Sequence, residues 1–251
     1  TINDVKSIQQ DTLSTDGDKQ AVLFTRALGE GKFGTTSLAT LIHSDGSLEE
    51  KVIKKAVVET TDGTSSEESS KIQTLNENRV KFLEYELKIS RQVSERGLNE
   101  IRDPATNEII GGVVRYGSLA TLSSGEKAIT LDFVEGKTIS QWINEGNALT
   151  DEHIHRMRII REQLNKKGAF HRDLHSGNVM ITPDGRIMII DLGFTHVYDP
   201  GTEPEGMDAF DRLSLEATII NGKTGHALLR DPATSKETAE KFIDDLVANP
   251  A

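Results

Sequence analysis

The chain has 251 residues and carries 29 Lys and Arg against 40 Asp and Glu, which gives a formal net charge of −11. A chain this acidic is a poor candidate for a general binder of nucleic acid or anionic membranes, because both partners repel it. Cysteine is absent, which excludes disulfides and thiolate metal sites. No apolar run approaches the roughly 18 residues that a membrane span requires, and the first residues lack a signal-peptide pattern. We therefore expect a soluble protein.

The first half of the chain is rich in predicted strands. Apolar or β-branched runs at 21–28, 35–43 and 51–58 are separated by a glycine-rich stretch and by a Ser-Asp-Gly-Ser turn, which favours a hairpin. Residues 59–70 are small, polar and acidic, so a mobile loop is expected there. A helix is predicted over 72–96, because its apolar residues share one broad face and Gly97 suits a C-cap. Two more strands are expected near 113–116 and 127–133.

The second half is predicted to be mainly helical. Thr150 can cap a helix that runs to about Lys167 with its apolar residues on one stripe. Two short strands follow at 179–181 and 186–190, joined by a Thr-Pro-Asp-Gly turn that suits a tight reversal. Further helices are expected near 208–220 and 236–248.

A glycine-rich segment, Gly29-Glu30-Gly31-Lys32-Phe33-Gly34, has the spacing G-x-G-x-x-G. A dinucleotide-binding fold uses the same spacing, but there the glycines open a helix. Here the residues that follow predict a strand. A glycine loop between two strands suits a flap over phosphates, with backbone N–H groups directed at them. An ordinary glycine hairpin is the competing interpretation.

Two segments in the second half carry the clearest chemical signal. Residues 170–179 read F-H-R-D-L-H-S-G-N-V and residues 189–194 read I-I-D-L-G-F. They resemble the H-R-D-x-x-x-x-N catalytic loop and the D-[FL]-G metal-binding motif of protein kinases, in the same order. The resemblance implies ATP-dependent phosphoryl transfer, with Asp173 as the base that orients the attacking hydroxyl. It also implies that Asn178 and Asp191 hold Mg²⁺, a cation that prefers oxygen ligands.

The resemblance also implies an ATP-binding set. Lys54 would contact the α- and β-phosphates and pair with Glu86 of the following helix; Lys55 and Glu84 are the alternatives for these two roles. Leu131 would be the gatekeeper of the nucleotide pocket. The other residues expected to contact ATP are Gly29, Gly31, Phe33 and Gly34 in the flap, and Asp132 and Val134 through their backbone.

Three further residues receive structural roles from the same resemblance. His171 would organise the backbone of the catalytic loop, and Asp211, on a later helix, would tie that loop down. In protein kinases the arginine at the position of Arg172 often binds an activation-loop phosphate. The alternative, which we favour, is that Arg172 packs structurally and that no loop phosphorylation is needed.

The resemblance spans about residues 22–222 and implies an α+β, two-lobed protein-kinase-like fold. We expect one kinase domain over 1–251, with a β-rich N-lobe at 20–131, a hinge at 132–135 and a reduced helical C-lobe at 136–251. No Ala-Pro-Glu segment lies between Asp191 and Asp211, and little chain follows Gly222. In this shortening the chain resembles minimal effector kinases that bacteria deliver into host cells.

The leading hypothesis is therefore a serine/threonine protein kinase that uses ATP and Mg²⁺. Its substrate would be a host signalling or cytoskeletal protein, reached after type III secretion into the host cytosol; a non-effector would be cytoplasmic. Two alternatives stay open. His175 occupies the position of a usual Lys, and small-molecule kinases of the aminoglycoside and choline class carry a similar D-x-H-x-x-N. A pseudokinase scaffold is the third hypothesis, although the expected catalytic residues are intact. The sequence does not fix the oligomeric state.

Overall fold

The computed structural model describes residues 9–15, 18–30, 34–56, 58 and 65–224. Two residues of the predicted glycine flap, Gly31 and Phe33, lie outside these ranges, as does the helix predicted near 236–248. The described part contains both sheets and helices, so the α+β prediction is confirmed. The division into two lobes stays a prediction of the sequence.

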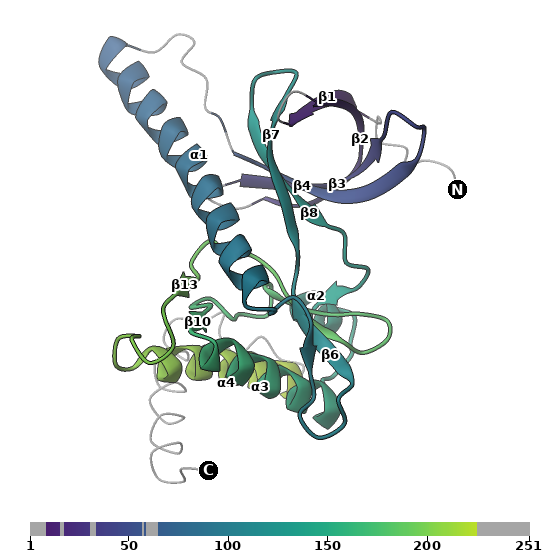
Figure 1. Cartoon of the computed structure of the whole chain (residues 1–251), viewed down its shortest axis with the longest axis vertical. Coiled ribbons are helices and arrows are strands. Elements are labelled where there is room, and N and C mark those ends of the chain that lie inside the picture. The colour runs from purple at the N-terminus through teal and green to yellow at the C-terminus, as the bar shows by residue number, and fades with distance from the viewer. Residues whose placement is uncertain (1–8, 16–17, 31–33, 57, 59–64, 225–251) are drawn as a thin grey trace.

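Six strands of the first half form a closed barrel (Figure 1). Its strand order is β1 (Gln9–Thr15), β2 (Asp18–Glu30), β3 (Gly34–Ile42), β4 (Leu48–Ala56), β8 (Lys127–Asp132) and β7 (Tyr116–Leu122). Closure comes from β1, which pairs with β2 along its whole length and with β7 through Leu13 and Leu122. Closing a sheet removes its open edges. The predicted N-lobe boundary at residue 20 leaves out β1, although this strand completes the barrel.

The helix α1 (Ser66–Glu95) runs from beyond the barrel to the helical part of the molecule (Figure 1). It begins earlier than predicted, so the expectation of a loop over 59–70 is wrong for residues 66–70. The Ser65 side chain accepts the Glu68 backbone N–H, and the acidic residues Glu67 and Glu68 in the first turn suit the positive end of the helix dipole. The helix ends before Gly97, whose φ of +67° agrees with the predicted C-cap.

A second, five-stranded sheet lies below the barrel. Its order is β5 (Ile101–Arg102), β6 (Ile109–Val113), β12 (Ile187–Ile189), β11 (Val179–Ile181) and β9 (Lys137–Thr138). The predicted strand at 113–116 is instead a junction, because β6 ends at Val113 and β7 begins at Tyr116. β6 pairs in parallel with β12 so closely that a Cβ on Gly111 would lie 1.8 Å from the Ile187 carbonyl oxygen. The chain between α1 and the barrel thus joins the lower sheet.

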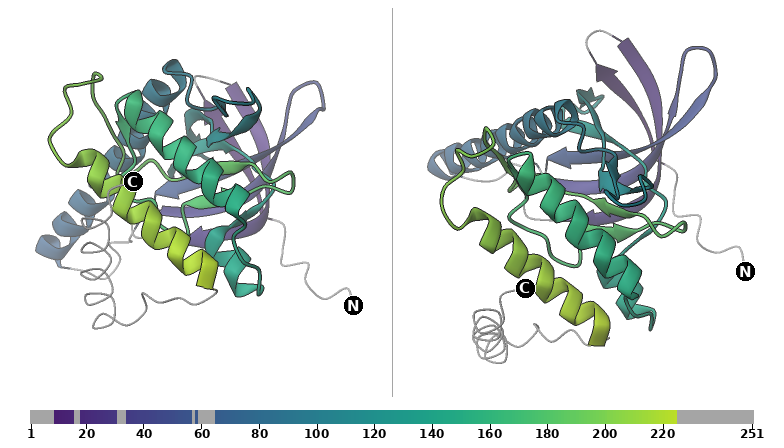
Figure 2. Two further views of the ribbon diagram at one scale, coloured as in Figure 1. Left: turned by 90° about the horizontal axis from the view of Figure 1, so that it is seen from below. Right: turned by 60° about the horizontal axis from the view of Figure 1, so that its bottom comes forward.

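The helices α2 (Ile139–Asn144) and α3 (Asp151–Lys166) pack on this sheet, and α4 (Met207–Thr224) packs against both helices. Thr150 caps α3 as predicted, and α3 and α4 lie side by side (Figure 2). Their apolar faces meet α1 and the sheet in the largest core cluster, which includes Ile160, Leu164, Ile189 and Leu215. A short ribbon of β10 (Ala169–Phe170) and β13 (His196–Val197) pairs the start of the predicted catalytic loop with the residues that follow Asp191. Residues 170–179, which hold the H-R-D-x-x-x-x-N motif, are called the catalytic segment below.

The helices were compared with the length and hydropathy that a membrane span needs. In the part of the chain that the structure describes, none combines the length and the apolar character that a crossing requires.

Candidate active site

Lys54 lies between α1 and the segment that follows β12. Its Nζ donates to both carboxylate oxygens of Glu86, at 2.9 and 2.7 Å, and to Oδ1 of Asp191 at 3.2 Å. Glu86 is fully buried and Lys54 is 8% exposed. One ammonium group thus connects the barrel, α1 and the segment of Asp191.

The two competing residues make different contacts. Lys55, the next residue of β4, faces away from Glu86 and approaches Glu126 at 3.8 Å, as expected because successive strand residues point to opposite faces. Glu84 is exposed on α1. The geometry therefore brings together Lys54 and Glu86, and neither alternative.

The three charges in this contact determine one another's protonation. Burial alone would lower the pKa of Lys54, but the carboxylates of Glu86 and Asp191 outweigh it and raise the pKa above its ordinary value. Burial would raise the pKa of Asp191, but Lys54 and the Gly193 backbone N–H outweigh it and lower that pKa. At neutral pH, Lys54 is therefore a fixed cation and Asp191 a fixed anion.

Asp173 and Asn178 contact each other in the catalytic segment. The Asn178 side-chain nitrogen donates to the carbonyl oxygen of Asp173 at 3.0 Å and to its Oδ2 at 3.2 Å. The Ile190 backbone N–H donates to the Asn178 carbonyl at 3.0 Å, which ties this segment to the residue before Asp191. His175 Nε2 lies 3.6 Å from Asp173 Oδ2. Asn178 thus connects Asp173, through its side chain, with the backbone next to Asp191, through its carbonyl group.

The donor set formed by Asn178 and Asp191 fits Mg²⁺. The side-chain nitrogen of Asn178 donates to Asp173, so the side-chain oxygen of Asn178 is left to face a metal. Mg²⁺ prefers oxygen ligands of this kind. Oδ1 of Asp191 accepts from Lys54 and from Gly193, whereas Oδ2 makes no hydrogen bond to any described residue. Mg²⁺ in nucleotide sites takes one or two protein ligands of this kind and completes its shell with phosphate oxygens and water.

Asp211 holds the catalytic segment from α4. Its carboxylate has no exposed surface and accepts the backbone N–H groups of His171 at 2.8 Å and Arg172 at 2.6 Å. Burial raises the pKa of Asp211, and these two N–H groups partly offset it. Arg172 has a φ of +64°, which costs energy for a residue other than glycine. The buried carboxylate therefore stabilises a strained backbone next to Asp173.

His171 and Arg172 complete the support of this segment. His171 Nε2 donates to the Ile190 carbonyl at 3.1 Å, and its Nδ1 accepts the Asp173 N–H at 3.3 Å. Burial lowers the pKa of His171, so its neutral form makes these bonds. Arg172 donates to Nε2 of His196 at 2.8 Å. The His196 ring thus accepts one N–H of the Arg172 guanidinium, the group that was considered for binding a loop phosphate.

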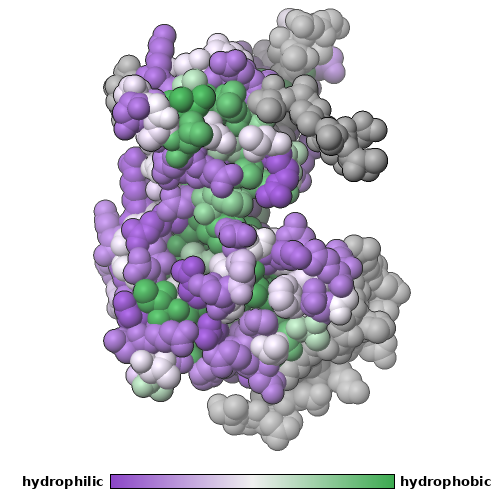
Figure 3. Space-filling model, turned by 90° about the vertical axis from the view of Figure 1, so that its right-hand side faces the viewer, coloured by the Kyte–Doolittle hydropathy of each residue, from purple (hydrophilic) through white to green (hydrophobic). Residues whose placement is uncertain are grey.

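The predicted hinge, residues 132–135, borders an apolar cluster. Val52 and Leu131 face each other across β4 and β8, and Val134 and Ile190 pack against the same cluster. Of the two residues predicted to bind adenine through their backbone, Asp132 already donates its N–H to the Arg115 carbonyl at 2.9 Å. The backbone groups of Val134 make no hydrogen bond to any described residue, so its contact with adenine stays a prediction. Figure 3 shows a hollow between the upper and lower parts of the molecule, with hydrophobic residues at its base.

The described glycines of the flap differ in what they allow. A Cβ on Gly34 would lie 2.5 Å from the Lys55 carbonyl oxygen, so this position needs glycine for the packing of β3 against β4. A Cβ on Gly29 would meet nothing within 4 Å. No described atom requires glycine at position 29, which lies at a shift in the register of β2 against β3, and its contact with ATP stays a prediction.

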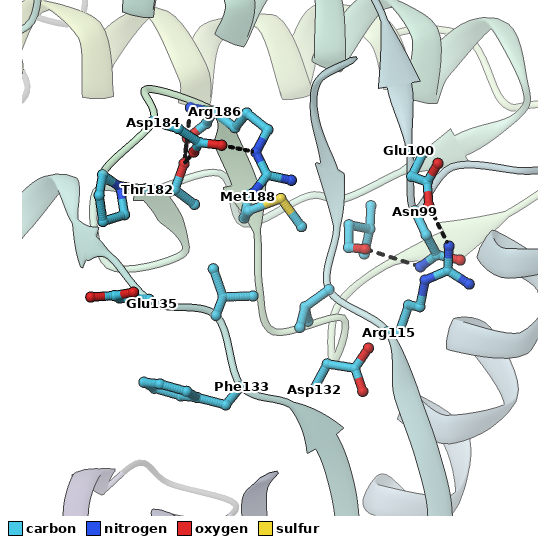
Figure 4. A pocket seen from close by; sticks show the side chains of 14 residues that line it. Asn99, Glu100, Arg115, Asp132, Phe133, Glu135, Thr182, Asp184, Arg186 and Met188 are labelled. Atoms are coloured by element: carbon cyan, nitrogen blue, oxygen red, sulfur yellow. Dashed lines mark hydrogen bonds and ion pairs between the residues drawn. The ribbon is translucent and has the colours of Figure 1, made fainter. Parts of the chain in front are cut away.

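A separate pocket of about 450 Å³ also borders the hinge (Figure 4). Its walls are the hinge, the junction between β6 and β7, and the turn of the β11–β12 hairpin. Four of its charged side chains form two pairs, Arg115 with Glu100 and Arg186 with Asp184, and Asp132 at its edge pairs with Lys51 of β4. Lys54, Asp173, Asn178 and Asp191 do not line it, so this pocket is not the phosphate site.

Sequence reasoning missed two residues of the site. Tyr116 contacts Glu86 and the segment of Asp191, and His196 binds Arg172. Neither belongs to a motif with a defined spacing. The available signals were weak: an aromatic residue before Gly117 at the start of a strand, and a histidine close after the D-L-G motif.

Comparisons with known proteins agree with a kinase-like domain. The family model of the ABC1 atypical kinase-like domain matches residues 119–213, a range that includes the predicted hinge and the residues from Asp173 to Asp211. An uncharacterized protein of Synechocystis is 32% identical over 83 residues, which are 32% of this chain and 15% of that protein.

Two further relatives have names that include a kinase. A protein of Clostridium perfringens, named a probable serine/threonine-protein kinase, is 28% identical over 129 residues, or 49% of this chain and 18% of that protein. The chloroplastic protein ACTIVITY OF BC1 COMPLEX KINASE 3 of Arabidopsis thaliana is 30% identical over 73 residues, or 28% of this chain and 10% of that protein. The chain spans less than a fifth of the length of these curated relatives. The similarity supports a protein-kinase-like family and no specific substrate.

Proposed function

We propose that this chain is an ATP- and Mg²⁺-dependent phosphotransferase that transfers the γ-phosphoryl group of ATP to serine or threonine hydroxyls of proteins. The observation that carries the proposal is the contact of Lys54 with Glu86 and Asp191, at 2.7 and 3.2 Å. Phosphoryl transfer is catalysed mainly by positioning and by charge stabilisation. A buried lysine fixed between two carboxylates, beside the Asp173–Asn178 pair, supplies both.

In the proposed reaction each residue has one task. Asp173 orients the substrate hydroxyl and takes its proton, while the hydroxyl oxygen forms a bond to the γ-phosphorus. The bond between that phosphorus and the β–γ bridging oxygen breaks, and ADP leaves. Lys54 binds the α- and β-phosphates, and Asn178 and Asp191 hold Mg²⁺. When bound there, the metal would offset the negative charge on the β- and γ-phosphates.

The test is phosphate transfer from labelled ATP with Mg²⁺ to the chain itself and to the proteins of a eukaryotic cell lysate, with sites mapped by intact mass and fragmentation. Asp173→Asn should lower transfer by about 100-fold or more and leave nucleotide affinity unchanged. Asp199→Asn is the matched control, because the side chain of Asp199 is 91% exposed. The proposal fails if no protein gains phosphate, or if Asp173→Asn transfers as fast as the wild type.

A small-molecule kinase is the second candidate. His175 in the Asp173-x-His175-x-x-Asn178 sequence favours it, since aminoglycoside and choline kinases carry this pattern. The same labelled ATP, offered with a panel of aminoglycosides and amino alcohols, separates the two candidates. Phosphate on one of these compounds, with none on protein, would decide for the second.

A role in a host cell is a finer part of the proposal. It rests on the short segment between Asp191 and Asp211, which lacks Ala-Pro-Glu and in this resembles bacterial effector kinases, of which the Salmonella type III effector SteC is one candidate relative. It predicts host signalling or cytoskeletal substrates. Expression of the wild type and of Asp173→Asn in cultured host cells, followed by comparison of their phosphoproteins and actin filaments, tests it. Identical cells in both cases would remove the host role and leave the enzymatic proposal intact.

A further inference from the structure

Tyr116 lies where the barrel, α1 and the segment of Asp191 meet. It is the first residue of β7, and its ring packs against both the core cluster beneath α1 and the large cluster around α3. Its hydroxyl donates to Oε1 of Glu86 at 2.6 Å and accepts the backbone N–H of Leu192 at 3.2 Å. One oxygen atom thus joins the partner of Lys54 to the residue after Asp191.

The chemistry of the hydroxyl fixes the direction of both bonds. Burial, together with the Glu86 carboxylate, raises the pKa of Tyr116 well above its ordinary value, so the phenol keeps its proton. A protonated phenol has one hydrogen to donate, and the carboxylate can only accept. The lone pairs of the oxygen are then free to accept the Leu192 N–H. Both bonds can therefore form at once, and neither can run in the opposite direction.

The backbone at Asp191 needs this support. Asp191 has a φ of +62°, a conformation that a residue other than glycine keeps only when its surroundings hold it. The peptide N–H that follows Asp191 is the one bound by Tyr116, and the Leu192 side chain is buried. The Tyr116 oxygen therefore holds the strained peptide in the orientation that directs Asp191 towards Lys54.

The start of β7 departs from regular pairing in a way that accommodates this contact. The register of β7 against β8 shifts between Tyr116 and Leu119. A Cβ on Gly117 would lie 2.3 Å from Oγ1 of Thr130, and that oxygen accepts the Ser118 backbone N–H at 3.0 Å. The Thr130 side chain thus replaces the backbone carbonyl that would normally accept the Ser118 N–H where the register shifts. The strand can therefore begin with Tyr116 directed at Glu86.

We propose that Tyr116 is a positioning residue, whose hydroxyl aligns Glu86 with Lys54 and orients Asp191 for Mg²⁺-dependent nucleotide binding. The inference rests on the proposed function, because it assigns to that site a residue outside the kinase motifs. Tyr116→Phe removes only the oxygen. It leaves the buried Leu192 N–H without its acceptor and removes one of the three hydrogen bonds that the Glu86 carboxylate accepts.

The experiment compares nucleotide affinity with and without the metal, measured by calorimetric titration of ADP in Mg²⁺ and in EDTA. We expect Tyr116→Phe to weaken binding in Mg²⁺ about tenfold, or about 1.4 kcal/mol, and to leave binding in EDTA nearly unchanged. A general loss of structure would weaken both alike. Tyr85→Phe is the matched control, because the Tyr85 hydroxyl donates to the Thr195 carbonyl at 2.8 Å in the same region but does not contact Glu86 or Leu192.

A double variant tests the route of the effect. If the hydroxyl acts through Glu86 and the Asp191 segment together, Tyr116→Phe in a Glu86→Gln background should cost clearly less than tenfold, since groups of one network are not additive. Equal affinities of wild type and Tyr116→Phe in Mg²⁺ would overturn this inference alone. A wild type that binds ADP no better in Mg²⁺ than in EDTA would overturn the proposed function and this inference with it.

Discussion

Removing the Asp211 carboxylate should destabilise the whole fold as well as the catalytic segment. Asp211→Ala leaves the buried N–H of His171 and the partly buried N–H of Arg172 without an acceptor. Each such loss costs about 1–3 kcal/mol, or about 2–6 kcal/mol for the pair. Part of this is offset because the carboxylate itself is unfavourably buried, as its raised pKa indicates. We expect a net loss of about 3 kcal/mol, which for a chain of this size lowers the Tm by about 6–12 °C.

The assay is urea unfolding followed by circular dichroism, with Asp208→Ala as the control on the same helix. The side chain of Asp208 is 63% exposed and binds Arg161, and a surface pair of this kind contributes about 0–1 kcal/mol. Asp211→Asn keeps the shape and one acceptor, so it should fall between the two. A loss for Asp211→Ala no larger than for Asp208→Ala would refute the anchoring role of this carboxylate.

Three further outcomes are expected. Burial lowers the pKa of His171 below 6.5, so its contribution to stability is complete above pH 6.5 and is lost as the pH falls towards the folded pKa; His171→Asn should show a smaller decrease in Tm between neutral and mildly acidic pH. Gly111→Ala should cost more than about 3 kcal/mol in urea unfolding because of its clash with β12, whereas Gly125→Ala, which is strained by a φ of +88° but meets no atom within 4 Å, should cost less than half as much. Arg172 is already bound by a histidine, so Thr202→Val, which removes a nearby phosphate acceptor, should transfer phosphate at the wild-type rate in the labelled-ATP assay.

Much of the catalytic segment could be predicted because its information is local. Asp173 and Asn178 are five residues apart, and the hairpin that leads to Asp191 has its turn residues written in the sequence. The cap at Thr150 is equally local. Lys54 and Lys55 could not be separated from the sequence, because the alternation of a strand gives two faces but does not say which one meets α1. The barrel around them decides that question.

The polar stretch before α1 shows where composition misled. Residues 65–70 lack apolar side chains, and a helix there buries little, so a loop was expected. The serine cap and two acidic residues nevertheless allow the first turn to form, and the long helix behind it extends into this turn because propagation costs less than nucleation. The polar composition of this stretch correctly indicated that it buries little surface, but it did not exclude a helix.

Barrel closure and the position of Tyr116 depend on pairs that are distant in sequence. β1 meets β7 across more than a hundred residues, with Leu13 opposite Leu122, and no local period marks that pairing. The parallel contact of β6 with β12 is similar. Its only trace in the sequence is the pair of glycines at 111 and 112, which are understandable once the close approach of the strands is known. Tyr116 becomes a site residue only because both pairings place its strand between α1 and Asp191.

The contact of β6 with β12 also determines which parts of the site can move against each other. The Val113 N–H donates to the Leu98 carbonyl at 2.9 Å, and the Val114 N–H donates to the Ile189 carbonyl at 3.0 Å. These bonds link the end of α1, which carries Glu86, to the strand that ends two residues before Asp191. Glu86 and Asp191 therefore belong to one hydrogen-bonded frame, whereas Lys54 belongs to the barrel. The bonds of Lys54 to both carboxylates, together with the Tyr116 hydroxyl of β7, therefore join the barrel to this frame.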